Sequence, residues 1–437
     1  MITRHHTPRP HCNIEFGAVR PHTRSKGVIN VNLQWTPMRW PPGWKNPEAL
    51  SLLKESVFNC LLLEAGADLG PVAEQAKRNG LAVVSTQPMG VRVAKGEWPG
   101  IQMAARGGGG VSAGPTGVPW INSNGWKARL EATLHPGDEV WIDAPPKGAR
   151  IFPESLAAAY LDTAACGGRW IVTLDDATAG AVAAQEARAL AGWKRLTTAA
   201  AFFDARKDWA GYAPEAVVGV VSSFGGDDEF LSGETLNLLA RANQQYRIVV
   251  KSGASEESWK GLRAILYVDG DAPAPALRRQ IEAQVQGGKM LIAGPGWGKV
   301  AGPLAKDQEH PRYEIRTMGR GKIAIAADAP TDPYELANDS VLLVSHRYEL
   351  LRFYNAGAEI AYLGAAADRQ HALLHLLLYA NRGPDDATVW IARRYRGATL
   401  RTTEKPEGQR LETTPVREGT ELHFPPLAQY AAVELEV

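Results

Sequence analysis

The sequence has few cysteines, no excess of charge of either sign and no long apolar run. Its three cysteines, Cys12, Cys60 and Cys166, are odd in number and far apart. This excludes a disulfide framework or a closely spaced metal knuckle and favours buried free thiols. Lys and Arg total 48 against 47 for Asp and Glu, so the formal charge of +1 offers no bulk attraction to nucleic acid or to an anionic membrane. A neutral partner therefore fits best.

No apolar run approaches the roughly 20 residues that span a bilayer. The first ten residues carry charge but no apolar core, so they predict no signal peptide. As written, the protein is expected in the cytoplasm, or in the periplasm or outside the cell if a leader was removed. No cofactor is expected. No metal is expected either: the N-terminal histidines lie in a proline-rich segment that has no second set of ligands, and they are His5, His6, His11 and His22.

The length of 437 residues is too great for one core, while 45% hydrophobic and 22% charged residues are typical of folded proteins. The pattern predicts an α/β protein of four parts. They are an N-terminal arm at 1–27, a (β/α)8-like barrel at 28–212, a flavodoxin-like or class I amidotransferase-like α/β domain at 213–365 and a small antiparallel β-sandwich at 366–437.

The barrel prediction rests on repeated strand and helix patterns. Seven apolar runs predict strands at 28–35, 58–64, 81–85, 101–103, 120–122, 140–143 and 167–176. Helices are predicted at 47–54, 71–79 and 153–165, with Pro at each start and Gly80 after the second. Nearly continuous apolar runs favour parallel strands covered on both faces. No clear eighth strand precedes the helical residues 199–209.

A smaller doubly wound unit is predicted from residue 216, with strands at 216–224, 246–250, 262–269 and 289–293. Residues 294–299 resemble a phosphate loop, but the loop is one residue short and Val300 stands where Ser or Thr would bind magnesium. The same turn carries the nucleophilic Cys in class I glutamine amidotransferases. Here that position is Gly296, which excludes triad catalysis.

The last region reads as short strands at 373–379, 388–392 and 431–437, which predicts the β-sandwich. Two histidines, His371 and His375, are four apart at its start. On a strand this spacing places both on one face, so packing is favoured over metal binding.

Polar and aromatic residues followed by Gly or Pro end the apolar runs between 98 and 146. Such endings are typical of the mouth of a parallel β/α barrel. Aromatic faces suit a sugar ring, and amides and carboxylates suit its hydroxyls, so these residues predict a carbohydrate site. The alternative is that the tryptophans pack in the core or under a lid. Four glycines at 107–110 read as a mobile lid or as a plain surface loop.

This order of domains resembles the trimeric bacterial β-galactosidases, which are multidomain glycoside hydrolases. The sequence segments that carry the resemblance are residues 232–243, 262–269, 287–298 and 425–435. The resemblance implies a carbohydrate substrate and a possible homo-oligomer, a dimer or a trimer.

The catalytic residues of that family cannot be transferred. The family carries Asn-Glu after the fourth barrel strand and Glu after the seventh. Here Asn122 and Asn124 are followed by Ser123 and Gly125, and the seventh predicted strand ends in two aspartates at 175–176.

Glycoside hydrolysis needs two carboxyl groups, about 5 Å apart for retention and roughly 6.5–9.5 Å apart for inversion. Asp143 and Asp175 end neighbouring predicted strands, and strands lie about 4.8 Å apart, so the pair can reach either separation. We predict that these two are the acid and the nucleophile or base, with Glu64 as the substitute. The sugar is expected to contact Trp35, Trp98, Trp120, Asn122, Asn124, Trp126 and Asp176.

Three alternatives compete with this site. Asp175 or Asp176 caps the helix that follows, as Asp at such a boundary commonly does. The barrel is catalytically inactive and binds carbohydrate or serves as an assembly subunit. A metal-dependent deacetylase or other metal hydrolase would need two His and a carboxylate at strand ends, and no predicted barrel strand ends in His.

Overall fold

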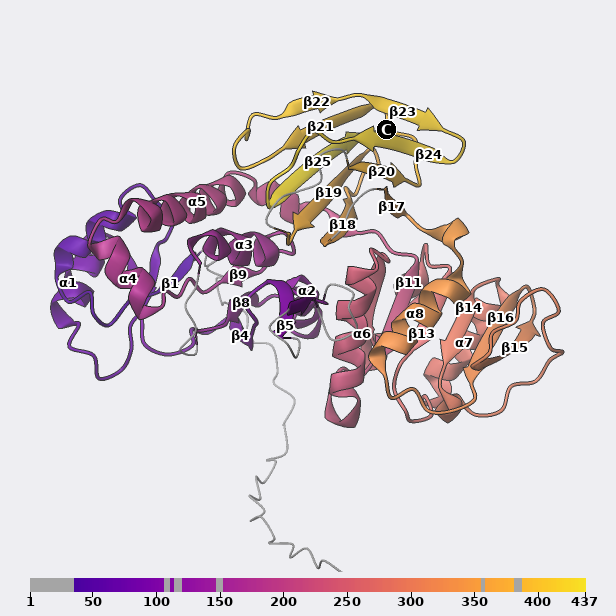
Figure 1. The fold of residues 1–437 in the computed structure, drawn as a ribbon. Helices are drawn as coiled ribbons and strands as arrows, with labels where there is room; N and C mark the ends of the chain where they lie inside the picture. The colour runs from indigo at the N-terminus through magenta and orange to yellow at the C-terminus, as the bar shows by residue number, and fades with distance from the viewer. Residues whose placement is uncertain (1–34, 106–110, 114–119, 147–151, 355–357, 381–386) are drawn as a thin grey trace, which may run out of the picture. The chain divides into compact units, whose positions relative to one another are not determined.

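The computed structural model describes residues 35–105, 111–113, 120–146, 152–354, 358–380 and 387–437. These residues belong to one unit, Trp35–Val437. Helices and strands alternate through most of it, so the expected α/β class is confirmed (Figure 1). None of the helices in the described ranges is long and apolar enough to cross a membrane.

The first region begins with short parallel strands and the helices between them. Its elements are β1 (Pro37–Arg39), η1 (Pro47–Leu53), β2 (Cys60–Leu62), α1 (Gly70–Arg78), β3 (Ala82–Val84), β4 (Val91–Lys95), β5 (Gly100–Ala105), β6 (Val111–Ala113), β7 (Trp120–Asn122), α2 (Gly125–Leu134), β8 (Glu139–Asp143), α3 (Pro153–Ala164), β9 (Arg169–Trp170), α4 (Asp176–Ala183), α5 (Ala187–Asp204) and η2 (Lys207–Gly211). Helix α1 has Pro in its first turn, and Gly80, with φ +78°, follows its end as the sequence predicts.

Two three-stranded parallel sheets, β1-β2-β3 and β4-β8-β9, make up the parallel strands of this region. A parallel bridge between Met38 and Val172 joins the edge strand β1 to the chain just after β9. The strand order is therefore β3-β2-β1-β9-β8-β4, the order of a ring that returns to its start. Among the described residues no pairing joins β3 to β4, so the structure shows six parallel strands with an opening rather than a closed set of eight.

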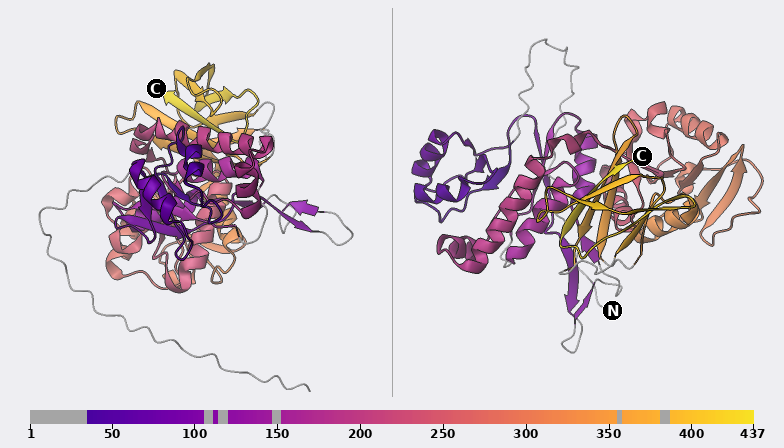
Figure 2. Two further views of the ribbon diagram at one scale, coloured as in Figure 1. Left: turned by 90° about the vertical axis from the view of Figure 1, so that its left-hand side faces the viewer. Right: turned by 90° about the horizontal axis from the view of Figure 1, so that it is seen from above.

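Two of the expected barrel strands differ from the structure, and a third is not tested by it. The strand expected at 28–35 lies almost entirely outside the described residues, and the first observed strand is β1. Those expected at 101–103 and 120–122 are wrong as parallel members, because β5 pairs antiparallel with both β6 and β7. The parallel position belongs to β4, which follows β3 without an intervening helix and so gives no strand–helix signal. Figure 2 shows β5 and β6 projecting as a ribbon away from the parallel strands.

Alternation along the strands separates an inner from an outer face. Cys60, Val91, Trp141 and Ile171 form a small apolar cluster of their own. Their sequence neighbours on the same strands, such as Leu61 and Ile142, belong to the larger core that contains the helices. The first set therefore fills the space enclosed by the parallel strands, and the second set packs outward against the helices.

The second region contains one six-stranded sheet. Its elements are β11 (Val218–Ser222), η3 (Gly226–Asp228), α6 (Glu229–Arg241), β12 (Tyr246–Val250), η4 (Lys251–Gly253), η5 (Glu256–Trp259), β13 (Ala264–Tyr267), α7 (Pro275–Gln286), β14 (Met290–Ala293), η6 (Pro295–Trp297), β15 (Tyr313–Met318), β16 (Gly321–Ala326), α8 (Pro333–Val344) and η7 (His346–Tyr348). The strand order is β12-β11-β13-β14-β16-β15, with only β15 antiparallel. The first four strands thus have the 2-1-3-4 order of flavodoxin-like sheets.

Helices cover both faces of this sheet. Val220 and Leu266 point into the core that contains α6 and α8, while Val221 and Ile265 join the cluster formed with α7. The turn after β14 requires glycine, because a Cβ at Gly296 would lie 2.0 Å from the carbonyl oxygen of Gly270. Close backbone approach accounts for the glycine at this turn.

The last region contains two antiparallel sheets, β10-β18-β19-β25-β21-β22 and β17-β20-β24-β23. Its strands are β10 (Ala213–Pro214), β17 (Leu351–Tyr354), β18 (Glu359–Ala365), β19 (His371–Leu378), β20 (Thr388–Ile391), β21 (Gly397–Arg401), β22 (Gln409–Leu411), β23 (Thr413–Val416), β24 (Gly419–His423) and β25 (Tyr430–Glu436). One face of the larger sheet shares a core with the smaller sheet, and the other face packs on the large helical core. Burial on both faces explains the nearly continuous apolar sequence of β19.

Of the two histidines of β19, His375 has the packing role that their spacing favours, and His371 does not. His375 stacks on Phe203, its Nδ1 lies 2.7 Å from the Tyr430 hydroxyl, and burial lowers its pKa to about 4. His371 is exposed and pairs with Asp368 at 2.9 Å.

Candidate functional site

The carboxyl ends of the parallel strands present charged side chains toward the enclosed space. Asp143, the last residue of β8, shares the inner face with Trp141, two positions earlier. Arg39, the last residue of β1, also faces inward, because its neighbour Met38 packs in the outer core. Lys95 ends β4 at the position paired with Asp143. Two cations and one carboxylate therefore stand at this end of the strands.

Arg39 and Asp143 form an ion pair across the strand ends. The Arg39 Nη2 donates to the Asp143 Oδ2 at 2.6 Å, and the two side chains are 33% and 23% exposed. Arg39 Nε and Asp143 Oδ1 are buried and have no hydrogen-bond partner among the described residues. Buried polar groups normally have partners, so this pair holds one unused donor and one unused acceptor that a ligand can satisfy.

The segment that follows β4 lies against the same end of β8. The Gly96 amide donates to the Asp143 carbonyl at 2.8 Å, and a Cβ at Gly96 would lie 2.3 Å from Ile142. Trp98 packs edge-on against the buried Trp170, with their ring centroids 5.3 Å apart, and its Nε1 is a second buried donor without a partner among the described residues. An indole N–H, a guanidinium N–H and a carboxylate oxygen are thus unused in this part of the structure.

The side chain of Asn124 makes structural hydrogen bonds to other parts of the protein. It is fully buried; its Oδ1 accepts from the Glu97 amide at 2.9 Å, and its Nδ2 donates to the Glu97 carbonyl at 2.8 Å. The same Nδ2 and the Asn124 backbone amide donate to Asp162, at 3.2 and 2.6 Å. The amide predicted to bind sugar is therefore committed to holding Glu97, which lies two residues beyond β4 and is exposed.

Asp162, on α3, completes this connection. It is fully buried, it also accepts a hydrogen bond from the Tyr379 hydroxyl, and burial raises its pKa to about 6. Residues from three distant segments, at 97, 124 and 162, are thereby joined by hydrogen bonds. Asp162 is absent from the predicted site; its signal in the sequence is an aspartate within the apolar stretch of α3.

The two aspartates after β9 lie at the start of helix α4, one as its N-cap and the other in its first turn. Asp175 Oδ1 accepts from the Thr178 amide at 3.0 Å, and its Oδ2 accepts from the Thr178 hydroxyl at 2.7 Å. Asp175 is therefore the N-cap of α4, and the exposed Asp176 begins the helix, where its charge favours the helix dipole. Glu64, two residues beyond β2, is exposed.

The remaining predicted contact residues lie elsewhere. Trp35 precedes β1, and its ring centroid lies 6.3 Å from that of Trp141. Trp35 therefore lies at the amino ends of the strands. Trp126 is buried on α2, where its ring lies 3.3 Å from a Cβ placed at Gly233 on α6. Asn122 is half-buried in β7. The Trp120 side chain and the loop at 107–110 lie outside the described residues.

One group of carboxylates in the described ranges has the spacing of a metal site. Asp228, Asp269 and Asp271 offer oxygens within 4.8 Å of one another in the second region. The Lys251 Nζ already lies 2.6 Å from Asp269 and 3.2 Å from Asp271. This ammonium supplies the positive charge, so the group reads as an ion-pair cluster.

Comparison with known proteins gives no match to any family model and none to any curated protein sequence. Solved structures do match. An α-L-fucosidase isoenzyme 2 from Paenibacillus thiaminolyticus aligns with a TM-score of 0.52 and 10% identity, over 92% of this chain and 100% of the fucosidase chain. The predicted resemblance to multidomain glycoside hydrolases is confirmed at the level of the fold.

Two β-galactosidases also align. The enzyme from Rahnella sp. R3 matches with a TM-score of 0.48 and 11% identity, over 86% of this chain and 63% of its own. The enzyme from Bacillus circulans sp. alkalophilus matches with a TM-score of 0.46 and 10% identity, over 71% of this chain and 61% of its own. The chain thus spans less than two thirds of either galactosidase.

Proposed function

We propose that this chain is a glycoside hydrolase whose substrate lies at the carboxyl ends of its parallel strands. The observation that carries the proposal is the inward-facing Arg39–Asp143 pair, with an unused acceptor and an unused donor. The similarity of the fold to that of a fucosidase supports it. In this proposal Asp143 is the nucleophile or the base.

The second carboxyl group in this proposal is Glu97. Glu97 lies two residues beyond the Lys95–Asp143 register pair that ends β4, and adjacent strands lie about 4.8 Å apart. Its backbone is fixed by Asn124. Asp175 ranks below Glu97 because both of its oxygens already bind Thr178.

The first experiment is a screen of the purified protein against aryl glycosides, beginning with the α-L-fucoside and the β-galactoside. Against any substrate that is cleaved, Asp143→Asn should lower kcat by about 10²–10⁴-fold. Glu97→Gln should do the same for substrates with poor leaving groups and less for dinitrophenyl glycosides, whose departure needs little protonation. Asp138→Asn, an exposed change just before β8, is the matched control.

Other outcomes redirect the assignment. Full activity of Asp143→Asn would show that the strand-end site is not the catalytic site. Loss of activity in Asp175→Asn or Glu64→Gln, with Glu97→Gln active, would transfer the second role to that residue.

A second function, carbohydrate binding or assembly without catalysis, is favoured by one observation. Asp175 is taken up by its capping bonds, and the inward carboxylate Asp143 is already paired with Arg39. Absence of hydrolysis of every glycoside in the panel, together with saturable binding of an oligosaccharide in calorimetry, would establish this function. Sedimentation of the same sample would show whether the chain forms a dimer or trimer.

A further inference from the structure

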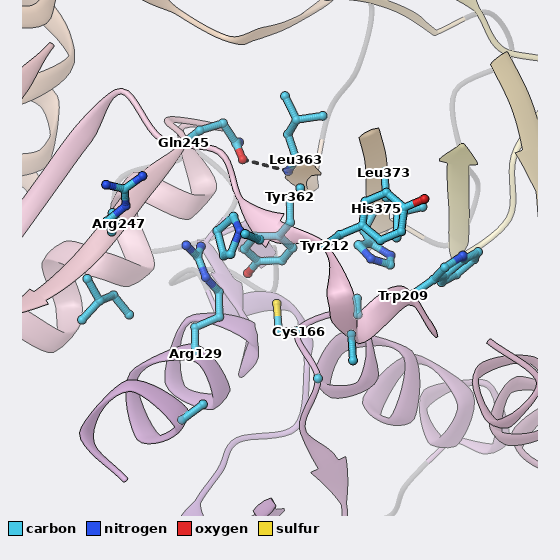
Figure 3. Close-up of a pocket in the computed structure, with 18 of the residues that line it drawn as sticks. Arg129, Cys166, Trp209, Tyr212, Gln245, Arg247, Tyr362, Leu363, Leu373 and His375 are labelled. Carbon is cyan, nitrogen blue, oxygen red and sulfur yellow. Dashed lines mark hydrogen bonds between the residues drawn. The ribbon is translucent and has the colours of Figure 1, made fainter. Parts of the chain in front are cut away.

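An open cavity of about 480 Å³ lies away from the strand ends just described. It is lined by α2, the segment after α3, residues 209–214 around η2 and β10, β12, β18 and β19. Its volume is within the range of small-molecule sites. Figure 3 shows Arg129, Cys166, Tyr362, Tyr212, Trp209 and His375 around this space.

The charge of the lining is one-sided. Arg129 and Arg247 line the cavity, and no Asp or Glu is among the described residues that do so. The other titratable groups are neutral near pH 7: burial lowers the pKa of His375 to about 4, raises that of Cys166 to about 12 and raises that of Tyr362 well above its usual value. The cavity wall therefore carries the positive charge of Arg129, while the Arg247 guanidinium is hydrogen-bonded to the carbonyls of residues 257, 258 and 260, which do not line the cavity.

Much of the hydrogen-bonding capacity of these groups is unused. A guanidinium has five N–H donors. Within the described ranges Arg129 uses one hydrogen bond, from Nη2 to the Tyr246 carbonyl at 2.7 Å, and Arg247 bonds only through Nη1, to carbonyls at 2.9–3.3 Å. The buried Tyr362 hydroxyl makes no hydrogen bond to a nitrogen or oxygen atom of the described residues and lies beside the Cys166 thiol, and Figure 3 shows both between Arg129 and Tyr212. A thiol is only a weak hydrogen-bond partner, so the hydroxyl can still donate to a stronger acceptor such as a ligand oxygen.

Apolar surface surrounds these polar groups. The Arg129 guanidinium lies 4.4 Å from the centroid of the Tyr246 ring and 5.6 Å from that of Tyr362, which fixes its plane. Trp209 and Leu373 belong to the wall. A planar fork held by aromatic rings beside apolar walls matches a carboxylate attached to a flat apolar body.

We propose that this cavity binds a small organic carboxylate with an aromatic or other apolar ring. The carboxylate pairs with Arg129 and accepts from the Tyr362 hydroxyl, and the ring lies against the Trp209 side of the cavity. The site is independent of the strand-end site and of whether that site hydrolyses glycosides.

The test is calorimetric titration of the full chain with benzoate, and with benzamide and acetate as matched probes. Benzamide keeps the ring and removes the charge, while acetate keeps the charge and removes the ring. Benzoate should bind with a Kd at or below about 1 mM, and each matched probe should bind at least about tenfold more weakly. Absence of benzoate binding, or equal affinity for benzamide, overturns the proposal.

Variants locate the binding. Arg129→Gln should weaken benzoate at least about tenfold, whereas Arg195→Gln, an exposed change on α5, should leave it unchanged. Ala132→Trp places a ring at the cavity wall from an exposed helix position, so it should block benzoate without disturbing the core. If Arg129→Gln does not fold, Ala132→Trp decides, since unchanged binding in that variant rejects this cavity as the site.

Discussion

Replacing Asp162 by Asn removes one titration from a fully buried contact while keeping its hydrogen bonds. The Asn124 amide and side chain donate to one Asp162 oxygen, at 2.6 and 3.2 Å, and the Tyr379 hydroxyl donates to the other. An asparagine oxygen can accept the two bonds from Asn124. Its NH₂ group can donate to the Tyr379 oxygen, because a hydroxyl both donates and accepts.

The sign of the effect follows from the direction of the shift. Burial raises the pKa of Asp162 from 3.8 to about 6, and the hydrogen bonds from Tyr379 and Asn124 oppose this rise only in part. Between about pH 4 and pH 6 the folded protein therefore binds more protons than the unfolded chain. The stability that this group contributes is complete below about pH 4 and is lost as the pH rises through about 6. A shift of about two units corresponds to about 3 kcal/mol.

Urea unfolding of the wild type and of Asp162→Asn, measured from about pH 4 to about pH 8, tests this value. Relative to the variant, the wild type should lose about 3 kcal/mol of unfolding free energy over this interval. Other titrating groups, such as Glu359 and His375, are present in both proteins and cancel in the difference. A difference that stays constant with pH would refute the reasoning, because it would mean that Asp162 has the same pKa in both states.

Two further predictions follow from buried groups. Gly125→Ala should lower the free energy of unfolding in urea by about 1–3 kcal/mol, because the new Cβ would lie 2.5 Å from the Tyr362 hydroxyl. Gly180→Ala, on α4, has open space around its Cβ and should be neutral or stabilising. Equal effects of the two changes would contradict this prediction. Burial raises the pKa of Glu359 to about 7, against a hydrogen bond from Asn243, so its contribution is lost as the pH rises through about 7. Glu359→Gln should therefore be more stable than the wild type at about pH 8 by about 1–3 kcal/mol, and an unchanged unfolding midpoint there would disprove the shift.

Local signals in the sequence predicted much of the fold. Apolar runs located β2, β3 and β8 and the strands β11 to β14, because a strand buried on both faces must be apolar throughout. Pro and Gly located the ends of α1, since they determine where a helix can start and stop. The same local chemistry offered capping as the alternative role of Asp175, and that is the position the structure gives it.

The parallel set of strands and the site depended on tertiary contacts. β1 and β4 carry Arg and Lys among few apolar residues, so neither resembles a buried strand until its neighbours are known. Which carboxylates face the enclosed space depends on strand register, and a shift of one residue reverses the face of every side chain. Asp143 was found from its strand end. Its partner Arg39 and the chain from Asp162 through Asn124 to Glu97 join residues far apart in sequence, and only folding brings them within hydrogen-bonding distance.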